Sequence, residues 1–328
     1  MVYSAAMPTD ERNPVTLDTE LTITEGRQRA VLSPWGAALR RYYEVDAAGR
    51  ETNIVWGYSG GNQKKGGQGD VLIPFPGRIA EGRYTFDGCT YQLERNDKEG
   101  PNAIHGFVRN LPWRVAEQTA SAVRFEVTID AAMYAEKGYP FSLSCLLTYR
   151  LEQGGLTCRF DVRNVGTAAA PVGIGFHPYF VIGVDPVDGA EVTIPARSYL
   201  AFNERLAPTG QVLSVDGSEW DYRRMREVGA HRFNHCYLHL DRDGQGVATA
   251  VFRNPQSGRT IRIAMDESFY AIVVYTGDAI PNAARQALAI EPMTCASDAF
   301  NHPEWGLRRL APGETFSGRF SIHHESRG

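Results

Sequence analysis

Two ionisable residues stand in contexts that favour proton transfer. His177 lies in the segment Gly-Ile-Gly-Phe-His-Pro-Tyr-Phe, and Glu291 follows a short apolar run and precedes Pro292. An imidazole in a half-apolar cleft can keep its pKa near neutrality and exchange protons, although a histidine among aromatic residues is more often a core residue. A carboxylate at the end of an apolar strand is either paired with an arginine or held at a raised pKa for proton transfer. The residues alone leave these alternatives open.

Arg78 and His105 stand in segments suited to binding a polar ligand. Arg78 follows Pro-Phe-Pro-Gly, and because two prolines and a glycine do not fit a central strand, we expect this arginine to leave a rigid turn. Its planar fork of donors suits carboxylates or vicinal hydroxyls, with a surface arginine paired to an acidic residue as the alternative. His105 precedes Gly106, where the backbone of a neighbouring segment can approach closely.

The segment Gly60–Gly69 (GGNQKKGGQG) is the one low-complexity patch. It lacks the Gly-Lys-Ser/Thr ending of a phosphate-binding loop, so we do not expect a phosphate cradle. A mobile surface loop is one interpretation. Because the segment runs directly into the turn before Arg78, a lid over a site near that arginine is the other.

No metal site is expected from the histidine spacing. His231, His235 and His239 are four residues apart, which would align them on a helix, but the sequence around them is typical of a strand. On a strand, His235 and His239 would lie roughly 13 Å apart, too far to share one ion. The acidic run that begins at Asp241 has Phe252 where a calcium loop needs a glutamate, so a hairpin turn is the better interpretation.

Alternation of apolar and polar residues predicts an all-β protein. It is clearest over residues 123–129, 141–149 and 156–162, and Gly- and Asp-rich pairs that suit tight turns recur along the chain. Short helical pieces are expected only near residues 130–137 and 297–302, with Asp298 and Asn301 as turn and cap residues. We therefore predict a single large antiparallel β-sandwich of many strands.

Length and charge fit one globular unit without a nucleic-acid partner. The 328 residues show no linker, so we expect a partly ordered N-terminal extension over residues 1–20 and one domain over residues 21–325. The 34 Lys+Arg and 38 Asp+Glu residues give a net charge of −4. Nucleic-acid binding normally needs a basic surplus, so this class of partner is not expected.

Cysteine usage and hydropathy predict a cytoplasmic protein. The five cysteines are far apart in the sequence and form no Cys-x-x-Cys pair, which favours reduced thiols. Residues 1–14 lack the apolar core of a signal peptide, and no run of 18 apolar residues is present, so no membrane partner is expected. A monomer or a homodimer fits these features.

Four short motifs together resemble the aldose 1-epimerase (galactose mutarotase) family, and the resemblance extends over roughly residues 21–320. The resemblance implies a galactose mutarotase-like β-supersandwich, no metal or organic cofactor, and interconversion of the α and β anomers of a free aldose, a small-molecule monosaccharide. The motifs occur in the family's order and approximate spacing, at Phe75–Leu93, His105-Gly106, Phe176–Phe180 and Ile290–Pro292.

Carried over position by position, the resemblance makes Glu291 the general base and His177 the general acid. His105 and Arg78 would bind the sugar and help to hold charge at its ring oxygen. Mutarotation needs one proton removed from the C1 hydroxyl and one delivered to the ring oxygen, and the return step needs the same groups in swapped protonation states. Ordinary pKa values of ~4.3 and ~6.5 must approach one another for this, which burial of Glu291 would achieve.

One sugar-binding aspartate of the family has no counterpart here. Its strand corresponds to Arg-Phe-Asn-His-Cys-Tyr-Leu-His-Leu, so that Asn234 or His235 occupies the position. This departure bears on substrate preference more than on chemistry, because an asparagine can still bond a hydroxyl. Aromatic residues that could stack on the sugar, with core packing as the alternative, are Trp35, Trp113, Phe107 and Tyr179.

Three other functions compete with a free-aldose mutarotase. A non-catalytic carbohydrate-binding protein on the same fold would not need Glu291 and His177 together. A glycosidase would need a second carboxylate about 5–9.5 Å from Glu291, for which only Asp298 is a candidate. A hexose-6-phosphate mutarotase would need a cationic pocket, for which the candidates are Lys64, Lys65, Arg83 and Arg109.

Overall fold

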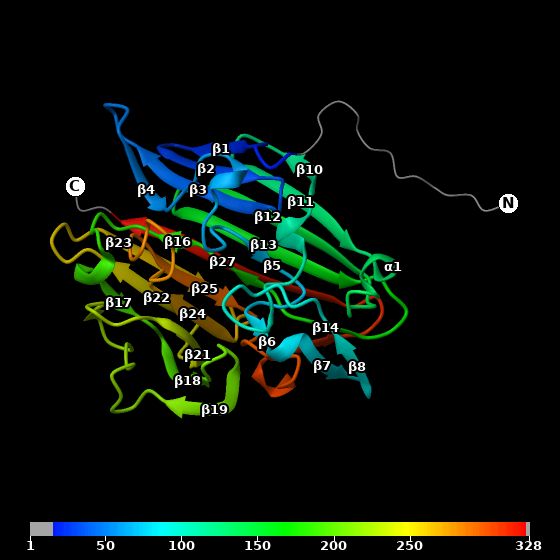
Figure 1. The fold of residues 1–328 in the computed structure, drawn as a ribbon. Coiled ribbons are helices and arrows are strands. Elements are labelled where there is room, and N and C mark those ends of the chain that lie inside the picture. The colour runs from blue at the N-terminus through cyan, green and yellow to red at the C-terminus, as the bar shows by residue number, and fades with distance from the viewer. Residues whose placement is uncertain (1–15, 326–328) are drawn as a thin grey trace.

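A computed structural model describes residues 16–325 of the chain and arranges them as two large antiparallel sheets that pack face to face (Figure 1). The predicted all-β supersandwich is confirmed. Most of the predicted N-terminal extension, residues 1–15, lies outside the described residues. The first strand begins at Leu21 and the last ends at Glu325.

The larger sheet has 12 strands. Ten of them follow one another in space in the order β1 (Leu21–Glu25), β2 (Gln28–Ser33), β3 (Ala38–Val45), β4 (Glu51–Val55), β16 (Tyr179–Phe180), β25 (Leu288–Met293), β24 (Ala271–Tyr275), β21 (Asn234–Leu240), β18 (Ala196–Phe202) and β19 (Pro208–Ser214). The other two, β15 (Gly175–Phe176) and β5 (Val71–Leu72), extend it beside β25. β25 therefore lies in the middle of the sheet, between β16 and β24.

The smaller sheet has nine strands. Their order is β10 (Arg114–Gln118), β11 (Ala122–Ile129), β12 (Leu143–Glu152), β13 (Gly155–Asn164), β27 (Thr315–Glu325), β23 (Thr260–Met265), β22 (Ala248–Arg253), β17 (Glu191–Thr193) and β20 (Arg226–Glu227). Three two-stranded ribbons complete the strands: β6 (Arg78–Ile79) with β9 (Ala103–Ile104), β7 (Arg83–Phe86) with β8 (Cys89–Gln92), and β14 (Ala170–Val172) with β26 (Arg308–Leu310).

The hydrophobic core lies between the two sheets, as the alternating sequence pattern requires. Leu147 of β12 is paired with Phe160 of β13, and both side chains are buried. Polar residues alternate with the buried ones along each strand and point to the exposed face, as Arg150 and Arg159 do. The same alternation holds in β11, where Phe125 is buried and Arg124 is exposed.

Helical structure in the described residues is short. The prediction near residues 130–137 corresponds to α1 (Ala131–Tyr134), which Asp130 caps by accepting a hydrogen bond from the Ala132 amide. The prediction near residues 297–302 is wrong, because that stretch forms turns and is followed by a 3₁₀ helix, η5 (Pro303–Trp305). The other 3₁₀ helices are η1 (Gly61–Gln63), η2 (Ala80–Gly82), η3 (Val108–Asn110) and η4 (Val187–Gly189).

Two further sequence features have a structural counterpart. All five cysteines are free thiols, four of them buried and Cys89 exposed, as predicted. Within residues 16–325, no helix is long and apolar enough to cross a membrane.

Candidate active site

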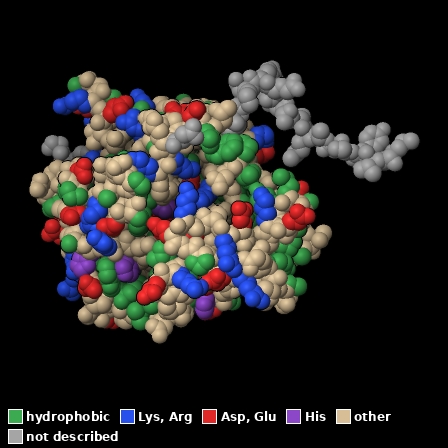
Figure 2. Space-filling model, viewed as in Figure 1, with side chains coloured by type: hydrophobic (Ala, Val, Ile, Leu, Met, Phe, Trp, Pro, Cys, Tyr) green, Lys and Arg blue, Asp and Glu red, His purple; other side chains and the backbone are tan. Residues whose placement is uncertain are grey.

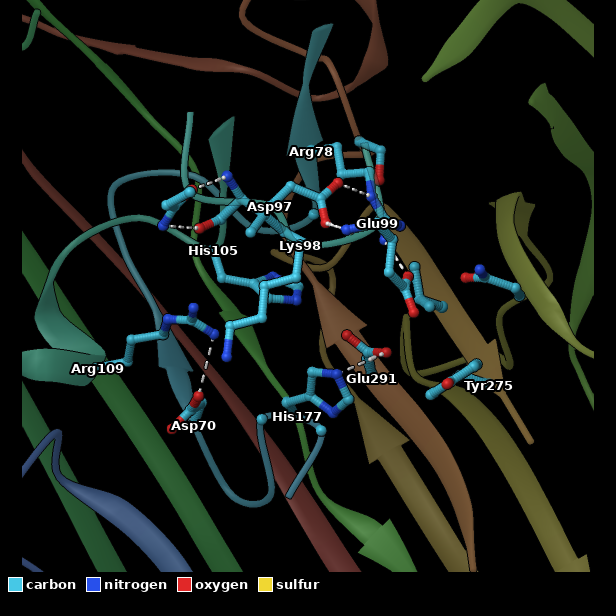
Figure 3. A pocket seen from close by; sticks show the side chains of 18 of the residues that line it. Asp70, Arg78, Asp97, Lys98, Glu99, His105, Arg109, His177, Tyr275 and Glu291 are labelled. Atoms are coloured by element: carbon cyan, nitrogen blue, oxygen red, sulfur yellow. Dashed lines mark hydrogen bonds and ion pairs between the residues drawn. The ribbon is translucent and has the colours of Figure 1, made fainter. Parts of the chain in front are cut away.

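The four residues singled out for chemistry converge on one cavity of about 520 Å³ (Figure 3). They come from four separate elements: Arg78 from β6, His105 from the turn after β9, His177 from between β15 and β16, and Glu291 from β25. On the viewed surface of the molecule, acidic and basic side chains are intermingled (Figure 2). A concave site with convergent polar groups is the usual form of a small-molecule site.

Glu291 and His177 face each other at the bottom of the cavity. Oε1 of Glu291 lies 3.4 Å from Nε2 of His177. Both side chains are buried, with relative exposures of 3% and 5%. The two groups are thus close enough to touch one sugar and to exchange a proton with it.

Glu291 lies inside β25, whereas the sequence had placed it at the end of a strand. Pro292 led to that prediction because proline rarely fits a central strand. On one side of β25, β16 pairs with Ala289 and β15 pairs with Met293. The residues between Ala289 and Met293 take no part in this pairing. Glu291 lies in this interruption of the ladder, opposite the segment that carries His177.

Burial moves the pKa values of the acid–base pair in opposite directions. It raises the pKa of the Glu291 carboxyl well above its ordinary value, with the charge of Arg78 opposing the shift. It lowers the pKa of His177 to about 3, and the charge of Arg109 adds to this effect. The expectation that the pKa of His177 stays near neutrality is therefore wrong. When the pair holds one proton, the carboxyl carries it and the imidazole is neutral.

His105 reaches the cavity through a tight turn. Its φ is 66° and that of Gly106 is 63°, and a Cβ atom at position 106 would lie 2.1 Å from the Ile73 carbonyl oxygen, so only glycine fits there. The His105 ring meets the His177 ring edge-on, with 5.4 Å between centroids. Burial, followed by the charges of His177 and Arg109, lowers the pKa of His105 well below its ordinary value. A neutral His105 can accept or donate a hydrogen bond to a sugar hydroxyl.

Arg78 combines both interpretations that the sequence left open. Its Nε donates to Asp97 Oδ2 over 2.7 Å and its Nη2 donates to Glu99 Oε2 over 2.9 Å, so it is paired with acidic residues. It is nevertheless a cavity residue and only 12% exposed. The sequence reasoning missed both partners, because they stand in a loop without any periodic pattern.

The glycine-rich segment forms one wall of the cavity. The Gly69 amide donates to the His177 carbonyl over 2.9 Å, and the Tyr179 hydroxyl donates to the Gly66 carbonyl over 2.8 Å. A Cβ atom on Gly67, whose φ is +79°, would lie 3.2 Å from Cδ2 of His177. The Tyr179 ring stacks on the other side of His177 at 5.0 Å between centroids. His177 is thus held between this segment and Tyr179, and a lid-like motion of the segment stays a prediction.

A second buried carboxylate in the cavity wall was missed. Asp70 is 2% exposed, forms an ion pair with Lys64, and lies 3.4 Å from Nη1 of Arg109. Burial raises the pKa of Asp70 while the two cations oppose that shift. Its backbone carbonyl accepts a hydrogen bond from the His177 amide over 3.0 Å. An aspartate immediately before an apolar run, as in Gly-Asp-Val-Leu-Ile, was the available signal.

Residues 19–323 match the family model of aldose 1-epimerase. The chain belongs to the aldose 1-epimerase family. It is 32% identical over 234 residues to the Escherichia coli K12 protein YihR, covering 71% of each chain. It is 28% identical over 309 residues to galactose mutarotase of Mus musculus, covering 86% of this chain and 87% of the relative, and 26% identical over 271 residues to aldose 1-epimerase of Escherichia coli K12.

Solved structures share the fold of this aldose 1-epimerase family member. The crystal structure of a GalM/aldose epimerase homologue from C. elegans superposes with a TM-score of 0.82 at 19% identity, covering 94% of this chain and 99% of that one. A galactose mutarotase-like protein from Clostridium acetobutylicum superposes with a TM-score of 0.79 at 20% identity, covering 93% and 95%. At these identities the likeness concerns the fold.

Strand register separates Asn234 from His235, the two residues predicted as alternatives for one binding position. Cys236 is paired with Val273, and Val273 with Glu291, so Cys236 and Asn234 share the face that carries Glu291. His235 also lines the cavity, but its ring lies against Trp220 with 3.9 Å between centroids. Burial lowers the pKa of His235 to about 4. Asn234 is therefore the better placed side chain for a sugar hydroxyl.

The remaining candidates divide between the cavity and the core of this aldose 1-epimerase family member. Trp35 lines the cavity, whereas Trp113 is buried in the core and Phe107 stacks on Tyr134. Asp298 accepts hydrogen bonds from the Ala80 amide and the Asn301 side chain, as a turn residue does, and does not line the cavity. Within residues 16–325, no group of three or more His, Cys, Asp or Glu side chains is arranged to hold a metal ion.

Proposed function

We propose that this protein is a mutarotase that interconverts the α and β anomers of free hexoses, with Glu291 as general base and His177 as general acid. The observation that carries the proposal is the buried carboxyl–imidazole pair, 3.4 Å apart in a polar cavity large enough for a sugar. Membership of the aldose 1-epimerase family supports the reaction class. The free thiols support the further proposal that the protein is cytoplasmic.

The proposed reaction moves two protons in opposite directions. Ionised Glu291 takes the proton of the C1 hydroxyl while protonated His177 gives its proton to the ring oxygen, and the C1–O5 bond breaks to leave an open-chain aldehyde. Rotation about C1–C2 exposes the other face of the carbonyl. On closure, the C5 hydroxyl attacks C1 and gives its proton to His177, and Glu291 returns its proton to the carbonyl oxygen. The pair thus begins and ends the cycle with one proton.

The neighbours of the pair support these roles. Burial favours the neutral carboxyl and imidazole, which is the arrangement reached after ring opening. The sugar must therefore lower the free energy of the charged arrangement when it binds. The Arg78 charge acts in that direction because it lowers the pKa of Glu291. Arg78 and His105 are also placed to donate hydrogen bonds to a ring oxygen that gains negative charge.

The cations of the cavity bear on whether the sugar is free or phosphorylated. Of the cations weighed for a phosphate, Lys65 and Arg83 are not among the cavity-lining residues, and Lys64 and Arg109 both pair with Asp70. Asp70 offsets one of these two charges, and Lys98 also lines the cavity, so the assay below includes a phosphorylated sugar.

Polarimetry on freshly dissolved sugars tests the proposed function. We expect the protein to accelerate the approach of α-D-glucose or α-D-galactose to anomeric equilibrium, and to act more weakly on glucose 6-phosphate. Equilibrium binding of sugar without faster mutarotation would instead identify a non-catalytic carbohydrate-binding protein. Release of reducing ends from a glycoside would identify a glycosidase.

A further inference from the structure

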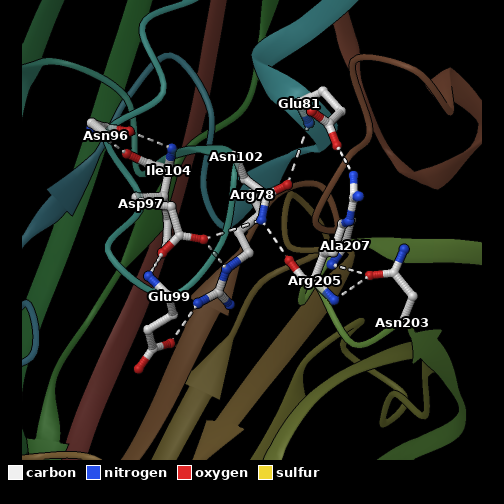
Figure 4. Close-up of polar contacts among 10 residues, drawn as sticks. All are labelled: Arg78, Glu81, Asn96, Asp97, Glu99, Asn102, Ile104, Asn203, Arg205 and Ala207. Atoms are coloured by element: carbon white, nitrogen blue, oxygen red, sulfur yellow. Dashed lines mark hydrogen bonds and ion pairs between the residues drawn. The ribbon is translucent and has the colours of Figure 1, made fainter.

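Two acidic side chains hold the guanidinium of Arg78 from the loop between β8 and β9 (Figure 4). Asp97 Oδ2 accepts from Nε over 2.7 Å and Glu99 Oε2 accepts from Nη2 over 2.9 Å. Among residues 16–325, Nη1 has no hydrogen-bond acceptor. The two carboxylates thus fix the plane of the guanidinium and leave one nitrogen for a ligand.

Asp97 is itself held in a buried network. Its side chain is 3% exposed, Oδ1 accepts from the Glu99 amide over 3.0 Å, and Oδ2 also accepts from Asn102 Nδ2 over 3.2 Å. Asn102 is 1% exposed and donates a second hydrogen bond to the Arg205 carbonyl over 2.8 Å. Arg205 in turn pairs with Glu81. Asp97 is thus anchored from several sides, whereas Glu99 is 45% exposed and, within the described part of the chain, held through Arg78 and its own backbone.

We propose that Asp97, assisted by Glu99, is a positioning residue of the site: this carboxylate clamp aims Arg78 into the cavity and offsets the charge that Arg78 directs at Glu291. The inference rests on the proposed function, because it concerns the proton exchanged by Glu291. Neither carboxylate touches the reacting atoms in this scheme. Both act through the arginine.

The clamp matters because Arg78 is the cation that counteracts burial at Glu291. The other titratable or charged groups that line this cavity come from every surrounding element. They are Lys64, Asp70, Lys98, His105, Arg109, His177, His235, Cys236 and Tyr275. Lys64 and Arg109 share the carboxylate of Asp70, whereas Arg78 is the cation that opposes burial at Glu291. A change in the charge beside Arg78 should therefore change the pKa of Glu291.

Asp97→Asn separates the charge of the clamp from its shape. The amide oxygen of an asparagine can still accept from Arg78 Nε, but it offsets none of the arginine's charge. The pair is active while it holds one proton, which Glu291 carries in the free protein, so kcat/KM falls as pH rises through the pKa of this carboxyl. The uncompensated Arg78 lowers that pKa, and the descending limb of the profile moves to lower pH. Because the Arg78 guanidinium is also held less firmly in its orientation, the plateau of kcat/KM falls by about 10- to 10²-fold.

The experiment measures kcat/KM for anomer exchange from acid to alkaline pH in the wild type and three variants. Glu99→Gln should move the limb in the same direction by less, because its carboxylate is half exposed and screened. Asp87→Asn is the matched control, because Asp87 also pairs with an arginine, Arg309, over 2.7 Å but lies outside the cavity lining. It should leave the profile unchanged. Thermal unfolding verifies that each variant is folded.

A double-mutant cycle tests whether the effect passes through Arg78. In an Arg78→Gln background, Asp97→Asn should move the limb no further. An unchanged profile in Asp97→Asn, or a limb that moves to higher pH because Arg78 has left Glu291, would overturn the inference. If Asp97→Asn does not fold, an unmoved limb in Glu99→Gln overturns it instead. A wild type that does not accelerate mutarotation would overturn the proposed function, which is a separate result.

Discussion

Glu291 and Asp70 are two buried carboxyl groups in the walls of one cavity, and their surroundings differ. Burial raises the pKa of both. Asp70 has Lys64 and Arg109 as direct partners, whereas Glu291 has a neutral imidazole at 3.4 Å and only the more distant influence of Arg78. At Asp70 two adjacent cations oppose the effect of burial on the pKa, whereas at Glu291 only the charge of Arg78 opposes it. The comparison separates a carboxyl group with two cationic partners from the one that we propose as the general base in the same cavity.

The largest expected effect concerns activity. Glu291→Gln should lower the rate of anomer exchange by about 10²–10⁴-fold with sugar binding largely intact, and His177→Asn should cost a similar factor, because each removes one proton-transfer group. Asp70→Asn should cost no more than about tenfold, because Asp70 acts on the site only through its neighbours. Polarimetry with isothermal titration of the sugar measures both quantities. Near-normal rates in Glu291→Gln would contradict the proposal that Glu291 is the general base and would leave no functional difference between Glu291 and Asp70.

The second effect concerns stability and its dependence on pH. The folded-state pKa of Glu291 is raised, so the stability it contributes is present below its unfolded value of ~4.3 and is lost as pH rises through the folded-state pKa. Glu291→Gln should therefore have a higher free energy of unfolding than the wild type at pH 8, by about 1–2 kcal/mol. Asp70→Asn should instead lose about 3 kcal/mol, because it leaves two cations uncompensated in the cavity wall.

Urea unfolding at pH 5 and pH 8 measures this pair of changes. Both substitutions change a carboxyl to an amide. Opposite changes in the free energy of unfolding at pH 8 would confirm that the two carboxyl groups have different surroundings. Destabilisation by Glu291→Gln at pH 8 would show that this carboxyl, like Asp70, is held by favourable partners.

The smallest expected effect concerns the wall that holds His177. Gly67→Ala places a Cβ atom 3.2 Å from His177 Cδ2 at a φ of +79°, so it should displace the imidazole and lower kcat roughly three- to tenfold. Gly88→Ala is the matched control, because Gly88 has a φ of +78° and nothing within 4 Å of its Cβ position. Both should lose about 1 kcal/mol of stability from backbone strain. Equal activity in the two variants would show that the glycine-rich segment does not determine the position of His177.

The strands and four site residues could be predicted from the sequence because their signals are local. Alternation over residues 123–129 and 156–162 fixes which side chains are buried, independently of where the strands lie. Arg78 and His105 stand beside prolines and glycines that mark special backbone. The structure brings these two residues together with His177 and Glu291 in one cavity. Their catalytic roles stay predictions.

The partners of these residues could not be predicted, because they depend on the path of the folded chain. Asp97 and Glu99 reach Arg78 from a loop about twenty positions away, and nothing in the spacing of that loop indicates where it turns. The direction in which the pKa of His177 shifts depends on the degree of burial and on the charge of Arg109, which are tertiary properties. The proline after Glu291 suggested a strand end because the interruption of the ladder is made by a different segment.

The central position of β25 has a consequence for synthesis of the protein on the ribosome. β25 joins β16 to β24, so the larger sheet stays in two separate parts, each with an unpaired edge, until residues 288–293 have emerged. The same strand delivers Glu291. A nascent chain released before this point would therefore lack both Glu291 and the strand that joins the two parts of the larger sheet, and would be prone to aggregate through the exposed edges.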